Sequence, residues 1–512
     1  MKRLLRAGVA TIAVSGVLLA AGPGSAVPEK PDDKTILHVL NRIGYGPRPG
    51  DIERVREKGL AAYIDQQLHP ERIADAAMAQ RLSTFETLGK SSRQLADEYY
   101  VPVQMARQQV KQERATDPSM ADARPRTPEQ TELARQQRIV LLELSQQKIL
   151  RAAYSERQLE EVLADFWFNH FNVFANKGAT QQYLTEYERD VIRPRVLGKF
   201  RDLLGATAKS PAMLFYLDNW QSVDPDAMQR RRPFMAPAQQ RPQRGLNENY
   251  GRELMELHTL GVDGGYTQAD VINVARAFTG WTIEQPRQGG GFRFEPRLHD
   301  DREKIVLGQK IKGGGGQSDG ERVLDILARH PSTARFVATK LARRFVSDTP
   351  PPALIDRAAA KFRETDGDIR EVVRVILTSP EFFAPDAYRA KVKTPFEFVV
   401  STIRATGSDV QSAEALVQAV RQLGMPLYLC QPPTGYADRA EAWVNTGALL
   451  NRMNFALQLV GGRMRGVQWD EAPIAPALIG ELSESTSATI AKSTGPRQVS
   501  ALTLGSPEFQ RR

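Results

Sequence analysis

Apolar residues recur at helical spacing through most of this chain, and three of these stretches begin with a capping box. In Thr127–Gln130, Ser155–Gln158 and Thr394–Glu397, a Ser or Thr stands three residues before a Gln or Glu, so two side chains can satisfy the free amides of a first helical turn. After the second box the apolar side chains keep the one-sided spacing of a helix packed on a core: Leu159, Val162, Leu163, Phe166 and Trp167. These patterns predict a mainly α fold, a globular bundle of many helices.

The chain of 512 residues contains one cysteine, Cys430. A single thiol cannot form an internal disulfide, so packing alone must hold the helices together. Because Cys430 stands in a proline-rich stretch with no histidine near it in the sequence, we interpret it as a buried or inert thiol. The length is ample for a large core, since a domain takes about 150 residues on average.

Two stretches without apolar periodicity divide the chain and are predicted to be loops. The stretch 116–126 is predicted to be mobile, and 229–245 is basic and proline-rich. The helical regions that these loops separate are an N-terminal region at 33–115, a central region at 127–228 and a C-terminal region at 246–512. We expect 127–512 to share one continuous core.

Strand patterns are scarce. Phe292–Phe294 alternates in polarity and Lys304–Ile311 contains β-branched residues, so these two segments are predicted to pair as one small β-hairpin near 292–311. Further along, the spacing predicts a helix that begins with Ser332 as its cap and continues through Phe345.

The first 26 residues are predicted to be a signal peptide. Lys2, Arg3 and Arg6 form a basic start, Ala7–Ala21 is apolar, and Gly24-Ser25-Ala26 offers small residues for cleavage. A membrane anchor is the alternative, but the apolar run is short for a span and Pro23-Gly24 interrupts it. We therefore expect export by the general secretion route to the periplasm or the medium, with no transmembrane anchor after cleavage.

The formal net charge is +9, which is mildly basic for a chain of this length. The arginines are spread along the sequence, and no long Lys/Arg run is interleaved with aromatic residues. Nucleic acid is therefore not an expected partner.

The segment 247–281 carries the densest set of polar residues and is predicted to be a helical hairpin. Asn247 is a good cap for its first helix and Gly261 is placed to end it. Glu248, Arg252 and Glu256 follow at i, i+4 and i+8, so the arginine is expected to bridge the two carboxylates. A turn then leads to a second capped helix.

Candidate site residues cluster in and around this hairpin. Arg252, Glu253, Glu256 and His258 are the catalytic candidates. Glu253 and Glu256 share a helix face, but a divalent metal would need further ligands from other segments. The residues that can supply them are His170, His299 and Asp300. The alternative is structural: buried histidines satisfied by carbonyl groups, and charged residues that support a helix.

Recognised catalytic and cofactor motifs are missing from the sequence. There is no G-x-S-x-G elbow in a strand–turn–helix frame, no dinucleotide-binding fingerprint and no C-x-x-C-H motif. No motif therefore implies a cofactor, and a divalent metal remains possible only through the residues above.

Several long motifs occur in a fixed order along the chain: Phe166–Phe171, Met213–Asn219, Asn247–Asp270, Phe278–Trp281, His299-Asp300, His330-Pro331 and Ser379–Phe382. In this order they resemble the large bacterial family catalogued as domain of unknown function 1800, over roughly residues 33–512. The resemblance implies an exported, mainly helical bacterial protein. Such proteins are often encoded beside a second family that looks like sulfatases and alkaline phosphatases, which makes such a neighbour a possible partner. The resemblance assigns no catalytic residue.

Three interpretations of the function follow. The first is an exported binding or accessory protein that acts with another envelope or secreted protein. The alternative is a metal-assisted, hydrolase-like enzyme with a cleft of Glu and His residues, so the sequence leaves open whether the chain is an enzyme. The third is a structural component of the cell surface or extracellular matrix.

Overall fold

A computed structural model describes residues 26–116, 127–226, 245–472 and 474–512 of the chain. The described part is mainly α, as predicted, and its strands form three two-stranded sheets. In these residues, no helix is both long and apolar enough to cross a membrane. The signal peptide and both predicted loops, apart from boundary residues, lie outside the described residues.

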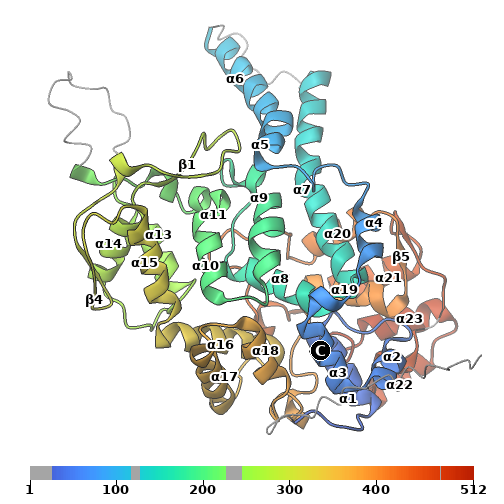
Figure 1. Ribbon diagram of the computed structural model, residues 1–512. Helices are drawn as coiled ribbons and strands as arrows, with labels where there is room; N and C mark the ends of the chain where they lie inside the picture. Colours follow the sequence, from blue (N-terminus) through green and yellow to red (C-terminus); the bar gives the residue numbers. More distant parts are fainter. Residues whose placement is uncertain (1–25, 117–126, 227–244, 473) are drawn as a thin grey trace, which may run out of the picture.

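The N-terminal helices are α1 (Asp33–Ile43), α2 (Asp51–Lys58), α3 (Leu60–Leu68), α4 (Ala76–Leu82) and α5 (Ser92–Leu95). Of these, α1 and α3 pack against α8 (Gln158–His170), which lies in the middle of the molecule (Figure 1). In α1, the Asp32 side chain caps the helix by accepting a hydrogen bond from the Thr35 amide at 2.8 Å. The buried face of α1 includes Ile36 and Leu40.

Two long helices, α6 (Val101–Thr116) and α7 (Pro128–Tyr154), lie side by side and extend beyond the rest of the molecule at the top of Figure 1. Helix α7 begins with the predicted capping box of Thr127 and Gln130. Its second half is buried and leads to the central helices. These are α8 (Gln158–His170), α9 (Leu184–Glu186), α10 (Phe200–Lys209) and α11 (Pro211–Tyr216).

The predicted helical hairpin is present as α13 (Glu248–Glu256) and α14 (Gln268–Ala277), which pack against each other. Helix α13 ends at Glu256, four residues before Leu260. The chain from there to Leu260 forms wider turns, in which the His258 amide bonds the Glu253 carbonyl and the Leu260 amide bonds the Met255 carbonyl.

The strands of this region pair differently from the prediction. Strand β2 (Phe292–Phe294) pairs antiparallel with β1 (Trp281–Ile283), while β3 (Lys304–Val306) and β4 (Gln309–Ile311) form a separate hairpin. The small hairpin therefore lies within 304–311, and Phe292–Phe294 is not part of it. The reason is that Trp281 is fully buried and its strand supplies the nearer partner, a choice that depends on packing rather than on local pattern.

Helix α15 (Gln317–Ala328) packs against α14. Below this region, in the view of Figure 1, lie α16 (Pro331–Phe345), α17 (Pro352–Glu364) and α18 (Ile369–Leu377). Helix α16 covers the predicted segment, but its cap is His330, whose ring accepts a hydrogen bond from the Ser332 amide at 3.2 Å. Pro331 occupies the first helical position, where its missing amide hydrogen costs no hydrogen bond.

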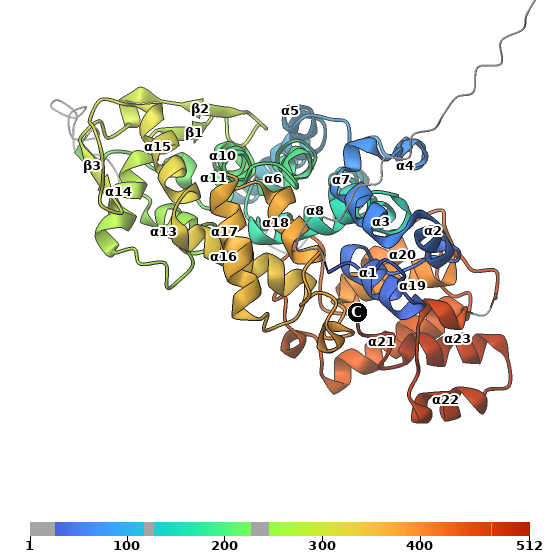
Figure 2. The same cartoon turned by 60° about the horizontal axis from the view of Figure 1, so that its bottom comes forward.

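The C-terminal helices lie beside the N-terminal ones, as Figures 1 and 2 both show. They are α19 (Pro395–Thr406), α20 (Glu414–Gln422), α21 (Thr446–Val460), α22 (Glu484–Ala491) and α23 (Pro496–Gly505), with a short pair of strands β5 (Asp409–Val410) and β6 (Val467–Gln468). The Arg404 side chain of α19 donates to the Gly46 carbonyl at 2.6 Å and to the Asp51 carboxylate at 3.1 Å. One hydrophobic cluster runs from Ile36 to Phe509 and joins the two ends.

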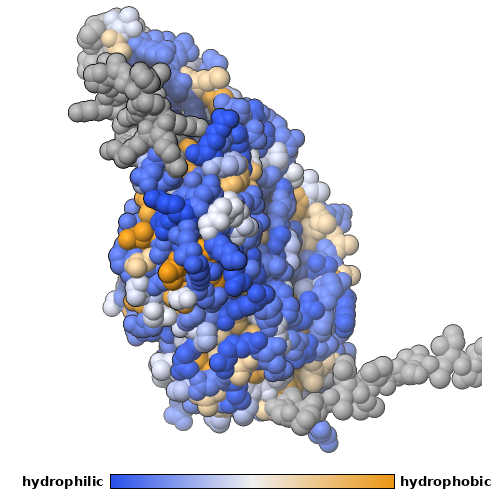
Figure 3. Space-filling model, turned by 60° about the vertical axis from the view of Figure 1, so that its left-hand side comes forward, coloured by the Kyte–Doolittle hydropathy of each residue, from blue (hydrophilic) through white to orange (hydrophobic). Residues whose placement is uncertain are grey.

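The surface is mainly hydrophilic on the side that Figure 3 shows, with apolar residues in small separate patches. Cys430 is buried and free, and burial raises the pKa of its thiol to about 11. The fold is therefore held by packing of apolar faces, without a covalent link.

Candidate functional site

His170 and His258, two of the predicted candidates, lie together in the core. His170 is the last residue of α8, and its Nε2 lies 3.1 Å from the backbone carbonyl oxygen of His258. The two ring centres are 6.4 Å apart. Both histidines are buried, and burial, followed by the charge of Lys340, lowers the pKa of each; for His258 the pKa falls to about 3. These imidazoles are therefore held neutral.

The candidates on α13 bond mainly to residues near the start of α14. Arg252 does not bridge Glu248 and Glu256; it donates to the Gln268 Oε1 at 2.8 Å, and Gln268 in turn donates to Glu248 at 2.7 Å. Glu256 accepts a hydrogen bond from the Tyr266 hydroxyl at 2.9 Å. Because Gln268 lies between Arg252 and Glu248, the expected ion pairs are replaced by a chain of hydrogen bonds that joins α13 to α14.

Glu253 is half-buried on the same helix. Burial, and then the nearby Glu256 carboxylate, raise the pKa of Glu253. Across residues 26–512 with their gaps, no three or more His, Cys, Asp or Glu side chains are grouped so that they could hold a metal ion. The donors suggested for a metal therefore remain separate: His170 is at the end of α8, while His299 and Asp300 belong to another cluster.

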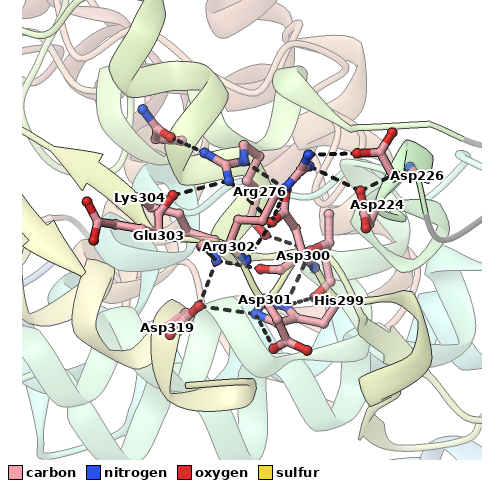
Figure 4. Close-up of polar contacts among 12 residues, drawn as sticks. Asp224, Asp226, Arg276, His299, Asp300, Asp301, Arg302, Glu303, Lys304 and Asp319 are labelled. Carbon is pink, nitrogen blue, oxygen red and sulfur yellow. Dashed lines mark hydrogen bonds and ion pairs between the residues drawn. The ribbon is translucent and has the colours of Figure 1, made fainter. Parts of the chain in front are cut away.

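That other cluster joins β3, α14 and α15, and Figure 4 shows it in close-up. The His299 side chain is fully buried; its Nδ1 lies 2.8 Å from the Thr279 carbonyl oxygen and its Nε2 lies 3.2 Å from the Asp319 carboxylate. The same Asp319 oxygen accepts from the ammonium group of Lys304 at 2.7 Å. Each of these buried polar groups has a partner, as a structural role requires.

Asp300 holds the second half of the cluster. Its carboxylate accepts hydrogen bonds from Arg276 at 2.8 Å and from Arg302 at 2.5 Å, and Arg302 also bonds Asp226 at 2.6 Å. Burial alone would raise the pKa of Asp300, but the two guanidinium groups hold it well below its usual range. With its charges mutually satisfied (Figure 4), this network serves to fasten the segments around α14 together, and we do not take it as the functional site.

A different place, a cavity of about 230 Å³ between α8 and α16, has unsatisfied charges instead. The segment 425–439, which crosses between these helices, forms its third wall. The residues that line the cavity are Asp165, Phe166, Asn169, His170, Lys340, Arg343, Arg344, Met425, Thr434, Tyr436, Ala437, Asp438 and Arg439 on these three walls, and Thr394 outside them. We call this cavity the basic pocket.

Helix α16 supplies three cations to the basic pocket. Lys340, Arg343 and Arg344 stand at i, i+3 and i+4, which places them on one side of the helix. Like charges at this spacing repel one another and weaken an isolated helix. Arg439 approaches from the opposite wall, and burial together with this like charge lowers the pKa of Arg343. Such crowding of positive charge on a half-buried surface is typical of a site for an anion.

The ammonium group of Lys340 lacks a counter-ion. It is half-buried, and its Nζ lies 5.5 Å from the centre of the Phe336 ring. Within the part of the chain that the structure describes, no carboxylate pairs with it and no group accepts a hydrogen bond from it. Burial lowers the pKa of Lys340 to about 8, against the opposing effect of Asp438.

Arg344 is buried and only partly satisfied. Its Nη1 pairs with the Glu397 carboxylate at 2.5 Å, and Glu397 is shared with Arg512 at 3.0 Å. The Nε and Nη2 atoms of Arg344 are buried without any hydrogen-bond partner. A buried donor without a partner is unfavourable by about 1–3 kcal/mol, so these two atoms indicate a place for an acceptor.

The two carboxylates of the pocket already have partners. Asp165 pairs with Lys148 at 2.9 Å, and Asp438 pairs with Lys391 at 2.8 Å. Within the described residues, no carboxylate pairs with Lys340, Arg343 or Arg439, so the pocket carries a surplus of positive charge.

The crossing segment is held in place by Asn169 of α8. Both amide atoms of this side chain bond the backbone of Tyr436: Nδ2 donates to the carbonyl at 2.8 Å and Oδ1 accepts from the amide at 2.7 Å. Gly435 before it has a φ of +72°, and a Cβ at that position would lie 2.3 Å from the Asn169 carbonyl oxygen. Only glycine lets the chain approach α8 this closely.

Sequence reasoning named one residue of the basic pocket, His170, and missed the cations. Lys340, Arg343 and Arg344 stand near the C-terminal end of α16, where basic residues are ordinary because they interact favourably with the helix dipole. The signal that could have found them is the closeness of three like charges on a helix whose remaining surface is mostly buried.

Comparison with known proteins identifies one family. The model of the family described as "Protein of unknown function (DUF1800)" matches residues 38–511. No curated protein and no solved structure matches the chain.

Proposed function

Because the chain belongs to the DUF1800 family, whose function is unknown, we propose its role from the basic pocket: it is an exported binding protein that holds a small anionic group there. The group is a carboxylate, phosphate or sulfate, alone or as part of a larger molecule. The observation that carries this proposal is the set of unpaired donors on one wall, the Lys340 ammonium and the free atoms of Arg344.

The physical reason is the compensation of buried charge. A guanidinium group cannot lose its proton in a protein. The Glu397 carboxylate that pairs with the buried Arg344 leaves two nitrogen atoms of Arg344 without an acceptor, which a bound anion or water would supply. Hydrogen bonds to charged groups contribute about 1.5–3 kcal/mol each. An oxyanion that reached both Lys340 and Arg344 would satisfy donors that the described side chains leave free.

Export and partnership belong to the same proposal. The basic, apolar and small-residue pattern of residues 1–26 supports secretion. We propose that the protein acts as an accessory to another secreted or envelope protein, and that a sulfatase- or phosphatase-like protein encoded by a neighbouring gene is the first partner to test. A partner of that kind handles the oxyanions that the basic pocket suits.

Anion binding is tested by calorimetry and thermal shift with inorganic sulfate and inorganic phosphate at constant ionic strength. The wild-type protein should bind at least one of them saturably. Lys340→Met should weaken that binding about tenfold, which corresponds to about 1.4 kcal/mol. Arg335→Gln is the matched control, because Arg335 is on the same helix but its side chain is 58% exposed and pairs with Asp356.

Two results would contradict the proposal. One is the absence of saturable binding of either anion to the wild-type protein. The other is an equal loss of affinity in Lys340→Met and Arg335→Gln, which would mean that the general charge of the surface, and not the pocket, attracts the anion. The partner is tested separately by co-expression with the neighbouring gene and affinity capture, and failure to recover a stable complex would count against the accessory role.

A further inference from the structure

Lys340 differs from the arginines around it because it can become a nucleophile. We propose that the Lys340 amine forms a reversible imine with the carbonyl carbon of a small anionic aldehyde or ketone, while the cations beside it hold the anionic group. This inference rests on the proposed anion site and adds a covalent step to it. It makes the class of ligand more specific: a carbonyl compound that carries a carboxylate, phosphate or sulfate.

The position of the amine supports this step. Lys340 lines a cavity, and the structure gives its Nζ no hydrogen bond or ion pair in residues 26–512 with their gaps. The Phe336 ring lies 5.5 Å from this Nζ, and Phe166 lines the cavity from the α8 wall. An amine that is desolvated and free of a carboxylate partner loses its proton more readily than one in water.

Burial is the main reason why this amine loses its proton readily. It lowers the pKa of Lys340 to about 8; the Asp438 carboxylate opposes this shift, and the like charge of Arg343 adds to it. An ordinary exposed lysine has a pKa of about 10.4. At pH 7.5 the neutral, reactive fraction of Lys340 is therefore larger than that of a surface lysine by roughly two orders of magnitude.

The other groups that face Lys340 determine how the pocket can hold a ligand beside the amine. His170 belongs to α8, and its imidazole is neutral and has an unpaired, buried Nδ1. Asp438 is on the crossing segment and is paired with Lys391. Arg344 and Arg439 remain to bind the anionic group of the ligand. The Lys340 amine and the groups proposed to bind the anion thus lie in one cavity.

The step itself is balanced without an oxidant or a metal. The amine nitrogen adds to the carbonyl carbon, and one amine proton moves to the carbonyl oxygen to give a carbinolamine. The nitrogen then loses its second proton, and the hydroxyl group leaves with a proton as water while a carbon–nitrogen double bond forms. The overall change is one amine and one carbonyl giving one imine and one water, and hydrolysis reverses it.

The inference is tested by trapping the imine with cyanoborohydride and measuring the modified lysines by peptide mass spectrometry. Glyoxylate is the anionic probe and acetaldehyde the uncharged comparison. At pH 7.5 we expect Lys340 to be modified by glyoxylate at least tenfold faster than Lys310, whose side chain is 62% exposed and paired with Glu303. We also expect inorganic sulfate to protect Lys340, and acetaldehyde to lose the preference for it.

Calorimetry on the wild-type protein separates this inference from the proposed function. The variant Lys340→Arg removes the nucleophile, so it should show no fast-reacting site. If wild-type protein binds the anion but Lys340 reacts no faster than Lys310, the imine step is wrong and the anion site stands. If Lys340 reacts fast with both aldehydes and sulfate gives no protection, the pocket does not select an anionic carbonyl compound and the inference is also wrong. If the wild-type protein binds no anion, the proposed function itself fails.

Discussion

Asn169 clamps the backbone of Tyr436 with both atoms of its side-chain amide, across 267 positions of the sequence. This contact joins α8 to the crossing segment and so determines the distance between two walls of the basic pocket. Asn169 is also part of the aromatic segment Phe166–Phe171 that the sequence had singled out. Its role is to position a wall, and it need not touch the ligand.

Replacement of Asn169 by Ala should lower the free energy of unfolding by about 1–3 kcal/mol, since it leaves two backbone groups of Tyr436 without partners. Anion affinity should fall as well, because the crossing segment would no longer be held. Urea unfolding and calorimetry measure the two effects. Asn451→Ala is the control: Asn451 is exposed on α21 and should change stability by no more than about 0.5 kcal/mol. Equal effects of the two substitutions would contradict the clamp.

Gly435→Ala tests the close approach of the crossing segment to α8. Both Gly435 and Gly424 have a positive φ, but a Cβ at Gly435 would collide with the Asn169 carbonyl oxygen, while a Cβ at Gly424 would meet nothing within 4 Å. Each alanine carries a penalty of about 1 kcal/mol for the left-handed conformation. Only Gly435→Ala should lower the stability further through the clash with the Asn169 carbonyl oxygen, and only this variant should reduce anion binding. Thermal unfolding of both variants measures the difference, and identical melting temperatures would show that the wall can shift freely.

The buried pair of Lys304 and Asp319 should show strong coupling. Lys304→Met or Asp319→Leu alone leaves a buried charge without its main partner, and we expect each to destabilise the protein by about 3–5 kcal/mol. The double variant removes both charges and should be less destabilised than the sum of the single variants. Denaturant unfolding of the four proteins completes the cycle. Strict additivity would mean that the two groups do not depend on each other.

Acid should destabilise the protein through its buried histidines. Burial, then Lys340, lowers the pKa of His258 to about 3, whereas the unfolded chain has an ordinary pKa of about 6.5. As the pH falls from about 6.5 to 3, the unfolded state takes up a proton that the folded state does not, so the free energy of unfolding falls by up to about 1.4 kcal/mol per pH unit for this group. The stability that depends on a neutral His258 is fully present above pH 6.5.

The variant His258→Leu should therefore unfold with a shallower dependence on pH. Urea unfolding at several values between pH 7.5 and 4.5 gives the slope, and the difference from the wild-type protein should correspond to about one proton. The imidazoles of His38 and His170 are also buried and have lowered pKa values, so part of the slope should remain. A slope that His258→Leu leaves unchanged would mean that this histidine is not kept neutral in the folded protein.

Local pattern was enough to predict several elements. The capping boxes at Thr127 and Thr394 are both formed, and the polar segment folds into the expected pair of helices, α13 and α14. These predictions succeed because capping and helix formation depend on residues three or four positions apart. The box expected at Ser155 did not form in that way: the Ser155 hydroxyl donates to Asp75 at 2.9 Å, a residue 80 positions away.

In the candidate site, too, some features follow from local pattern and others only from packing. Among the residues proposed for chemistry, His170 and His258 do lie together, but Glu253 and Glu256 do not join them around a metal, and His299 and Asp300 belong to a network of satisfied charges. The cations of α16 were not singled out, because in the sequence they look like the usual basic end of a helix. Only their burial beside Asn169 and Tyr436 makes the surplus of charge visible.

By itself, the sequence determined that this chain is mainly helical, has no disulfide and belongs with one family, because these properties follow from short-range spacing, from a single cysteine and from motif order. Tertiary structure alone decided that β2 pairs with β1 and that Lys340 and Arg344 face Asn169 and Asp438 across one cavity. These residues are far apart in the chain, and their contact depends on how whole helices pack, which no local pattern encodes.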